Sequence, residues 1–201
     1  VPVYEVGEAK GRSYIAMALI DGSPLAGVLP PRRAAEVVAQ AARALHAAHK
    51  QGILHRDIKP GNLLVDKLGR LFVADFGIAR RIGDPSISAT GVVVGTPAFM
   101  SPEQARGDRL DARTDVYSLG ATLYALVTGE PPVDDAPLPR GIPREIRIIA
   151  WKAMHPDPNL RFQTAAEMAD DLDRFLRGEP IVARGESAAS RLRKRFARNP
   201  A

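Results

Sequence analysis

The chain has 201 residues, of which 45% are hydrophobic and 25% charged, and its formal net charge is +5. This composition is close to the average for globular chains, and the length corresponds to one domain with an appendage. Because the chain contains no cysteine, a disulfide scaffold, a thiolate metal site and a cysteine nucleophile are excluded. The longest strictly apolar run, Tyr14 to Ile20, is far too short to cross a bilayer.

The excess positive charge lies at the C-terminal end. Residues 184–201 contain six basic residues and one acidic residue, so of the chain's 28 basic and 23 acidic residues 22 of each lie in residues 1–183. The body is therefore neutral, and we expect no nucleic-acid partner for it. Residues 181–201 are predicted to form a basic, flexible tail.

The first twenty residues predict two strands. Val1, Val3 and Val6 are β-branched, and Ser13 to Ile20 is a compact apolar run that follows a polar turn. Asp21 to Pro24 contains glycine and proline, and it is predicted to end the second strand as a turn.

Helices are predicted to dominate from residue 31 onward. Apolar residues recur at helical spacing from Ala34 to Lys50. Val116 to Thr128 is apolar nearly all round and predicts a buried central helix. Pro143 to Met154 predicts a further helix, and a capping box, Thr164 to Glu167, opens the last one.

Short strands and one long loop are predicted between these helices. Ile53–Leu54, Leu63–Val65 and Leu71–Ala74 are apolar segments separated by polar turns, as in buried hairpins. Residues 78–98 lack periodicity and predict a long functional loop. The expected fold class is α+β and predominantly helical, with an N-terminal β-hairpin.

Chemistry-bearing residues concentrate in two of the turns. The segment from His55 to Asn62 reads His-Arg-Asp-Ile-Lys-Pro-Gly-Asn, which is too polar to be buried for packing alone. Thirteen residues past Asn62, Asp75-Phe76-Gly77 follows an apolar strand, and Gly77 permits a sharp turn. A His-Arg-Asp triplet or an Asp-Phe-Gly triplet alone often occurs by chance, and a lone histidine is more often a core residue. Their order and context together make chance negligible.

On these motifs the chain resembles the protein kinase family, and specifically the large C-terminal lobe of bacterial, Hanks-type serine/threonine kinases. The resemblance continues through Ser101-Pro-Glu103, Asp115 to Gly120 and Arg161. It implies the following division of the chain: residual small-lobe strands and hinge in 1–20, large lobe in 21–180, catalytic loop in 55–62 and activation segment in 75–103.

The resemblance implies ATP- and Mg²⁺-dependent phosphoryl transfer to serine or threonine of a protein substrate. Asp57 would accept the proton of the substrate hydroxyl or orient that hydroxyl, and Lys59 would neutralise charge on the moving phosphate. Asn62 and Asp75 would supply hard oxygen ligands to Mg²⁺. Lys59 and Thr96 favour serine/threonine over tyrosine specificity.

The same resemblance implies an adenine site. Met17 matches the gatekeeper, the backbone of Ala18 and Ile20 would face the adenine edge, and Leu64 would form the floor, with Ala74 beside it.

Further motif residues are implied to support or regulate the site. His55 and Phe76 would pack, Asp115 would hold the catalytic-loop backbone, and Glu103 would pair with Arg161. Gly77 and Thr96 complete the implied structural set. A phosphate on Ser88 or Thr90 would give Arg56 a dianionic partner and order the activation segment.

Two histidines, His46 and His49, lie three residues apart on a predicted helix and are candidate metal ligands. No third ligand is evident, so a solvated helix face is the favoured interpretation.

Some parts of the kinase signature do not occur in these 201 residues: the Gly-rich loop, the strand lysine and its glutamate partner. The segment between Pro132 and Pro143 is also shorter than in relatives. We therefore expect the chain to be inactive alone. The rival hypothesis is a non-catalytic, pseudokinase-like remnant that serves as a protein-interaction module.

The basic tail resembles the juxtamembrane stretch of bacterial receptor-type kinases. It suggests an anionic membrane surface as a partner, while polyphosphate or nucleic-acid binding and a plain solvated end remain alternatives. The expected location is the cytoplasm, or the cytoplasmic part of a membrane-anchored kinase.

Overall fold

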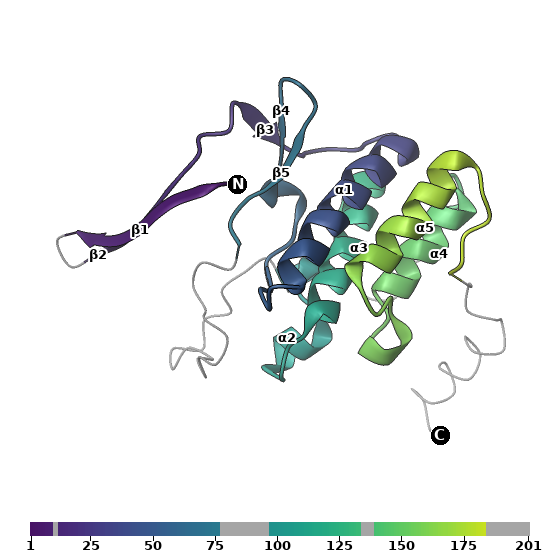
Figure 1. Ribbon diagram of the computed structural model, residues 1–201. Helices are drawn as coiled ribbons and strands as arrows, with labels where there is room; N and C mark the ends of the chain where they lie inside the picture. The colour runs from purple at the N-terminus through teal and green to yellow at the C-terminus, as the bar shows by residue number, and fades with distance from the viewer. Residues whose placement is uncertain (10–11, 77–96, 134–138, 184–201) are drawn as a thin grey trace.

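The computed structural model describes residues 1–9, 12–76, 97–133 and 139–183. A bundle of helices forms the body, and two small antiparallel sheets lie toward its N-terminal side (Figure 1). The helices are α1 (Pro31–His49), α2 (Pro102–Arg106), α3 (Ala112–Thr128), α4 (Arg144–Ala153) and α5 (Ala165–Arg177). The predicted α+β class, with helices predominating, is confirmed. No helix within these ranges is both long and apolar enough to cross a bilayer.

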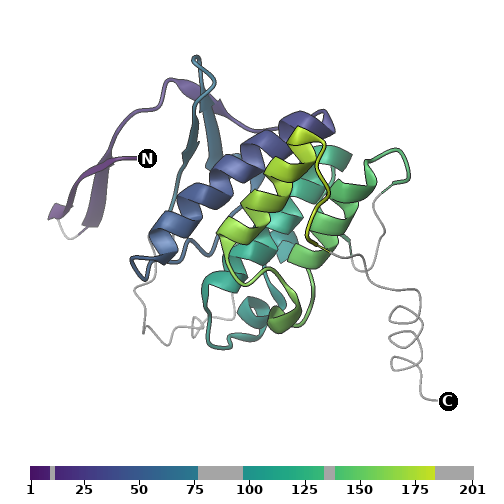
Figure 2. The ribbon, with the colours of Figure 1, turned by 45° about the vertical axis from the view of Figure 1, so that its right-hand side comes forward.

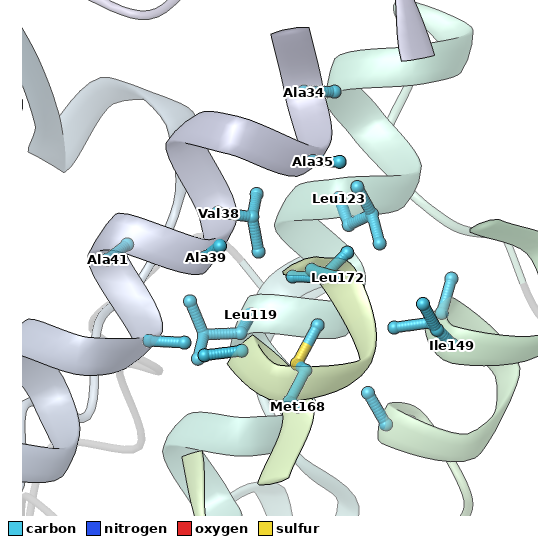
Figure 3. Packing of buried hydrophobic residues seen from close by; sticks show 14 of the residues in the cluster. Ala34, Ala35, Val38, Ala39, Ala41, Leu119, Leu123, Ile149, Met168 and Leu172 are labelled. Carbon is cyan, nitrogen blue, oxygen red and sulfur yellow. The ribbon is translucent and has the colours of Figure 1, made fainter. Parts of the chain in front are cut away.

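Helix α1 packs along both α3 and α5 through a face of small residues (Figures 1 and 2). Ala34, Ala35 and Ala41 are fully buried on this face, beside Val38 (Figure 3). Leu45 of the same helix is also fully buried. The alanines let the helix axes approach closely. The helix begins at Pro31, three residues earlier than predicted, because proline in the first turn lacks only an N–H that would have no intrahelical partner.

Helix α3 runs through the centre of the bundle, as its nearly all-apolar sequence predicts. It begins at Ala112, where the Asp111 side chain accepts from the backbone N–H of Arg113 as the N-cap, before the apolar stretch starts. A side chain at Gly120 would not fit, because a Cβ there would lie 2.6 Å from the Cβ of Ala153 in α4. This glycine therefore sets how closely α3 and α4 pack.

Helix α5 carries the predicted capping box in modified form. Thr164 Oγ1 accepts from the backbone N–H of Glu167 at 3.2 Å, as expected. The Glu167 carboxylate accepts from the N–H of Gln163, one residue before the position that a standard box uses. Met168 and Leu172 of this helix point into the core between α1, α3 and α4 (Figure 3).

The strands form two separate sheets. In the first, β1 (Val3–Ala9) pairs antiparallel with β2 (Arg12–Met17). The order in the second is β3 (Gly22–Pro24), β4 (Leu63–Asp66) and β5 (Leu71–Val73).

Two sequence predictions about these strands are wrong. The turn expected from Asp21 to Pro24 instead supplies β3, because pairing with β4 satisfies its backbone. A Cβ at Gly22 would lie 2.4 Å from the carbonyl oxygen of Val65, so glycine permits this pairing. Ile53 and Leu54 do not form a strand, and Ile53 is 49% exposed at the end of α1.

The β1–β2 hairpin stands clear of the helical bundle in both views (Figures 1 and 2). Its apolar side chains are exposed: Val3 by 56%, Val6 by 69% and Tyr14 by 40%. The amide of Ala18 donates to the Pro2 carbonyl and closes the hairpin, and the terminal amine donates to the carbonyl of Val73 in the second sheet. The hairpin therefore leads into β3 without a core of its own.

The segment that follows α5 is packed on the body rather than free. The carboxylate of Asp171, which is only 2% exposed, accepts from the backbone N–H groups of Val182 and Ala183, both at 2.7 Å. Ala183 is buried and Ile181 packs against the core. Residues 181–183, which were predicted to belong to the tail, therefore contact the body, and residues 184–201 lie outside the described part.

One buried ion pair ties α2 to the loop before α5. The Arg161 guanidinium meets the Glu103 carboxylate in a fork, with distances of 2.6 and 2.8 Å. Its remaining N–H groups donate to the carbonyl oxygens of His155, Arg113 and Pro156. All five donors are therefore used, which offsets the cost of burying the charge. The pairing predicted from the sequence is present.

The environment of Glu103 sets its titration. Burial alone would raise the pKa of this carboxyl, but the hydrogen bonds and charge of Arg161 outweigh burial and hold the pKa below its ordinary value. The carboxylate therefore stabilises the fold above the ordinary glutamate pKa, and this contribution is lost as the pH falls through the lowered one.

Arg161→Ala is expected to lower the free energy of unfolding by about 3–5 kcal/mol, because it leaves Glu103 as a buried, unpaired charge. Urea denaturation would show a lower midpoint at an unchanged m value. Arg177→Ala is the matched control, since Arg177 forms a similar two-point pair with Glu179 on the exposed surface. Equal losses in the two variants would contradict a special contribution from the buried pair.

Candidate functional site

The turn from His55 to Asn62 is fixed to the central helix by one carboxylate. Asp115, fully buried in the first turns of α3, accepts from the backbone N–H of His55 at 2.9 Å and of Arg56 at 2.8 Å. These two residues directly precede Asp57. The structure therefore places Asp115 where the sequence predicted a support for the catalytic-loop backbone.

The candidate catalytic side chains meet at one oxygen. Lys59 Nζ lies 2.8 Å from Asp57 Oδ2, and Asn62 Nδ2 donates to the same oxygen at 3.1 Å. Asn62 Nδ2 also donates to the backbone carbonyl of Asp57 at 2.7 Å. The structure therefore brings together three of the four residues predicted to be catalytic.

The buried His55 ring connects the catalytic loop to β5 and the residues after it. Its Nε2 lies 2.8 Å from the carbonyl oxygen of Ala74, and its Nδ1 lies 3.3 Å from the backbone N of Asp57. Because a carbonyl can only accept and an N–H can only donate, the proton is on Nε2 and Nδ1 is the acceptor. Burial lowers the pKa of His55, against the opposing effects of the hydrogen bond to Ala74 and of nearby acids, which agrees with the neutral ring that an acceptor Nδ1 requires. Phe76 packs on it, with ring centroids 4.7 Å apart.

The two candidate Mg²⁺ ligands lie on backbone segments that are hydrogen-bonded to each other. The amide of Ala74 donates to the carbonyl oxygen of Asn62 at 2.9 Å, and Asp75 comes next in the chain, with an exposed side chain. Because Asn62 uses its amide nitrogen for Asp57, its amide oxygen is the side-chain atom suited to a cation. An amide oxygen and a carboxylate are ligands suited to Mg²⁺, which takes its other positions from water and phosphates. The donor set therefore fits this ion.

Across the described residues, no cluster of three or more histidine, aspartate and glutamate side chains has the arrangement of an all-protein metal site. A Mg²⁺ ion held by Asn62 and Asp75 would consequently depend on oxygen ligands from elsewhere, as it does where phosphates complete its coordination.

Backbone strain marks both ends of this site. Arg56 and Asp75 have φ angles of 69° and 55°, in the left-handed region that side chains other than glycine rarely adopt. Each such residue costs about 1–3 kcal/mol and persists where its surroundings hold it. For Arg56 those surroundings include Asp115, which binds its N–H.

The residues predicted to face adenine lie in the strands β2 and β4 or close to strands. Met17 ends β2, Ala18 and Ile20 lie in the link to β3, and Leu64 in β4 pairs with Phe72 of β5. Ala74 is buried directly after β5. Of these five, Leu64 closely follows the catalytic loop in the chain and the amide of Ala74 is hydrogen-bonded to Asn62. The other three lie at the end of β2 and in the link to β3.

A pocket of about 300 Å³ lies between the link that follows β2 and the β4–β5 hairpin. It is lined mainly by the link after β2 and the β4–β5 turn, and includes Leu19, Asp21 and Lys67. Of the predicted adenine-facing residues it contains Ile20 alone. It is therefore not the predicted nucleotide site.

Several predicted residues lie outside the part of the chain that the structure describes: Gly77, Ser88, Thr90 and Thr96. Residues 77–96, which are most of the predicted activation segment, also lie outside the described part. Its end is described, and there Ser118 Oγ of α3 donates to the carbonyl oxygen of Phe99 at 2.8 Å.

The interpretation of His46 and His49 as a solvated helix face is wrong for His49. The His49 side chain is 6% exposed, and its Nε2 lies 2.7 Å from Asp115 Oδ2, the oxygen that also accepts from His55. The Nδ1 atoms of both rings are buried. His49 thus belongs to the support of the catalytic loop. Sequence spacing did not reveal this, because Asp115 is 66 residues away.

Gln104 is a second residue that the sequence reasoning missed. Its side-chain amide donates to the carbonyl oxygen of Arg56 at 2.7 Å, which links α2 to the catalytic loop.

Comparison with known proteins agrees with these features. The family model of the protein kinase domain matches residues 1–179. The serine/threonine-protein kinase PknB of Mycobacterium leprae is 43% identical in an alignment that covers 91% of this chain and 34% of that protein. A probable serine/threonine-protein kinase of Streptomyces coelicolor is 38% identical, covering 91% of this chain and 32% of that protein. The chain thus spans about a third of the length of the curated relatives it matches.

A solved structure shares the fold. The crystal structure of the Mycobacterium tuberculosis PknI kinase domain superimposes with a TM-score of 0.70 at 31% sequence identity, covering 86% of this chain and 70% of that one. Together with the match to nearly all of the described residues, this similarity shows that the chain belongs to the protein kinase family.

Proposed function

We propose that this chain is the catalytic lobe of a kinase that transfers the terminal phosphoryl group of ATP, with Mg²⁺, to serine or threonine residues of a protein. The observation that carries the proposal is the convergence of Lys59 and Asn62 on a single oxygen of Asp57. Phosphoryl transfer depends on positioning and charge neutralisation rather than on covalent chemistry by the protein, and this convergence supplies both.

Asp57 is arranged to receive a substrate hydroxyl. Its contacts to Lys59 and Asn62, within the described part of the chain, both fall on Oδ2. The side chain is 38% exposed, so Oδ1 can accept a hydrogen bond from a hydroxyl that arrives from solvent. Asp57 then orients that hydroxyl and takes its proton as the oxygen attacks.

The Lys59 ammonium group and a Mg²⁺ ion would occupy separate positions around Asp57. Lys59 holds its ammonium group beside Asp57, where negative charge develops on the transferred group. Asn62 and Asp75 would hold Mg²⁺, which supplies charge neutralisation at the ATP phosphates when bound. Neutral His55 keeps Ala74, and with it Asp75, at a fixed distance from the catalytic loop.

A protein-interaction module without catalysis is the second candidate. Its supporting observation is the exposed apolar surface of the β1–β2 hairpin. The retained Asp57, Lys59, Asn62 and Asp75 favour the enzyme.

The location that we propose is the cytoplasm, where ATP and protein substrates are both present. We also propose an anionic membrane surface as a partner for the basic residues of 184–201. Co-sedimentation with anionic vesicles, but not with neutral ones, would support this, and equal sedimentation with both would refute it.

The catalytic assignment can be tested in a chimaera that places the small lobe of a mycobacterial relative before Val1. Asp57→Asn should lower the turnover number by about 10²–10⁴ with nearly unchanged ATP affinity, because the proton acceptor and the ionic partner of Lys59 are lost while the predicted nucleotide contacts remain. Asp75→Ala should abolish Mg²⁺-dependent transfer. Transfer of labelled phosphate to a generic serine/threonine substrate measures both.

Asp170→Asn, an exposed change on α5, is the control and should have no effect. Turnover at the unsubstituted rate in either test variant would contradict the assignment. The 201-residue chain without the added lobe should show no measurable transfer and ATP binding weaker than about 1 mM, because two positioning elements are missing. An inactive chimaera together with specific binding of a partner protein would favour the interaction module.

Regulation by phosphorylation is a further prediction. Phosphate on Ser88 or Thr90 would offer a dianion to Arg56, so the Ser88→Ala/Thr90→Ala double variant of the chimaera should lose most of its activity. Mass spectrometry of the active protein should find phosphate on at least one of the two residues. Full activity in the double variant, with no phosphate at either position, would refute the prediction.

A further inference from the structure

The backbone of Arg56 is held from two sides by side chains of different helices. Asp115 of α3 binds its N–H at 2.8 Å, and Gln104 of α2 donates from Nε2 to its carbonyl oxygen at 2.7 Å. Arg56 also has the left-handed φ of 69°. A strained residue persists where its surroundings fix it, and here both the backbone N–H and the backbone carbonyl of Arg56 are held.

The contact from Gln104 falls on the peptide group that carries the candidate catalytic residue. The carbonyl of Arg56 and the N–H of Asp57 belong to one planar peptide unit. Gln104 holds the carbonyl end of this unit, and His55 Nδ1 accepts from the N–H end at 3.3 Å. Because the unit is rigid, its orientation sets the direction in which the Asp57 side chain leaves the backbone.

The side chain of Gln104 extends from a firmly held part of α2. Ser101 caps this helix and accepts from the backbone N–H of Gln104 at 3.3 Å. The preceding residue, Glu103, is locked in the buried pair with Arg161. The position of the Gln104 amide is therefore determined by the end of the activation segment and by the helices behind it.

We infer that Gln104 is a positioning residue for Asp57: by binding the Arg56 carbonyl, it couples the placement of α2 to the orientation of the catalytic-loop peptide. The inference rests on the proposed function for its kinetic consequence alone. The orientation of the peptide can be measured whether or not the chain is an enzyme.

The test removes the donor and keeps the shape. In Gln104→Met and in Gln104→Glu, the amide N–H that reaches Arg56 is lost, and the second variant also retains polarity. Hydrogen exchange of the Asp57 amide should become about tenfold faster, as expected when one hydrogen bond of about 1.4 kcal/mol no longer closes the loop. Amides of the central helix α3 should keep their exchange rates.

In the chimaera, both variants should lower the turnover number by about 10–100-fold, with the KM for ATP within about twofold, because Asp57 is misplaced while the nucleotide contacts remain. Gln163→Met is the matched control. Its amide also donates to backbone carbonyls, those of Pro158, Asn159 and Arg161, but far from the catalytic loop in sequence. Its turnover should be unchanged.

Unchanged exchange at Asp57, or exchange that quickens uniformly over the whole lobe, would overturn the inference. Loss of the fold in both variants would do the same, since it would show that Gln104 serves stability alone. If the unsubstituted chimaera has no activity, the proposed function fails, and exchange at Asp57 still decides the positioning role.

Discussion

The site depends on one fully buried carboxylate. Asp115 receives the backbone N–H groups of His55 and Arg56, and Nε2 of His49 reaches the same side chain. An ionised carboxylate is tolerated inside a protein when hydrogen-bond donors surround it. The two loop amides must therefore stay against α3, and this constraint delivers Asp57 to the place where Lys59 and Asn62 meet it.

Buried carboxylates also fix two other loops of the lobe to its helices. Glu103 is buried against Arg161, and Asp171 is buried against the N–H groups of the segment after α5. In each case a loop without regular secondary structure is fixed to the helical core by a charged group that cannot be left unpaired. The apolar core sets the positions of the helices, and these carboxylates set the positions of the loops.

The features that depend on local sequence patterns were predicted, whereas those that depend on contacts between distant segments were missed. The four longer helices were predicted from their apolar patterns, but the short helix α2 was not. The starts of α1 and α3 were also missed, because Pro31 and Asp111 act before the periodicity begins. Strand β3 looked like a turn, since pairing with β4 cannot be read from its own residues. The catalytic-loop residues form a contiguous motif and were identified together. His49 and Gln104 were not, because their partners lie 66 and 48 residues away.

The central claim, that Asp115 holds the catalytic loop in place, is tested most directly by hydrogen exchange in Asp115→Asn. Exchange at the His55 and Arg56 amides should quicken by about tenfold or more, because the asparagine can no longer accept from both. Asp171→Asn is the control, since Asp171 is equally buried and also binds two backbone amides, and it should free Val182 and Ala183 alone. Unchanged protection of His55 and Arg56 in Asp115→Asn would contradict the account.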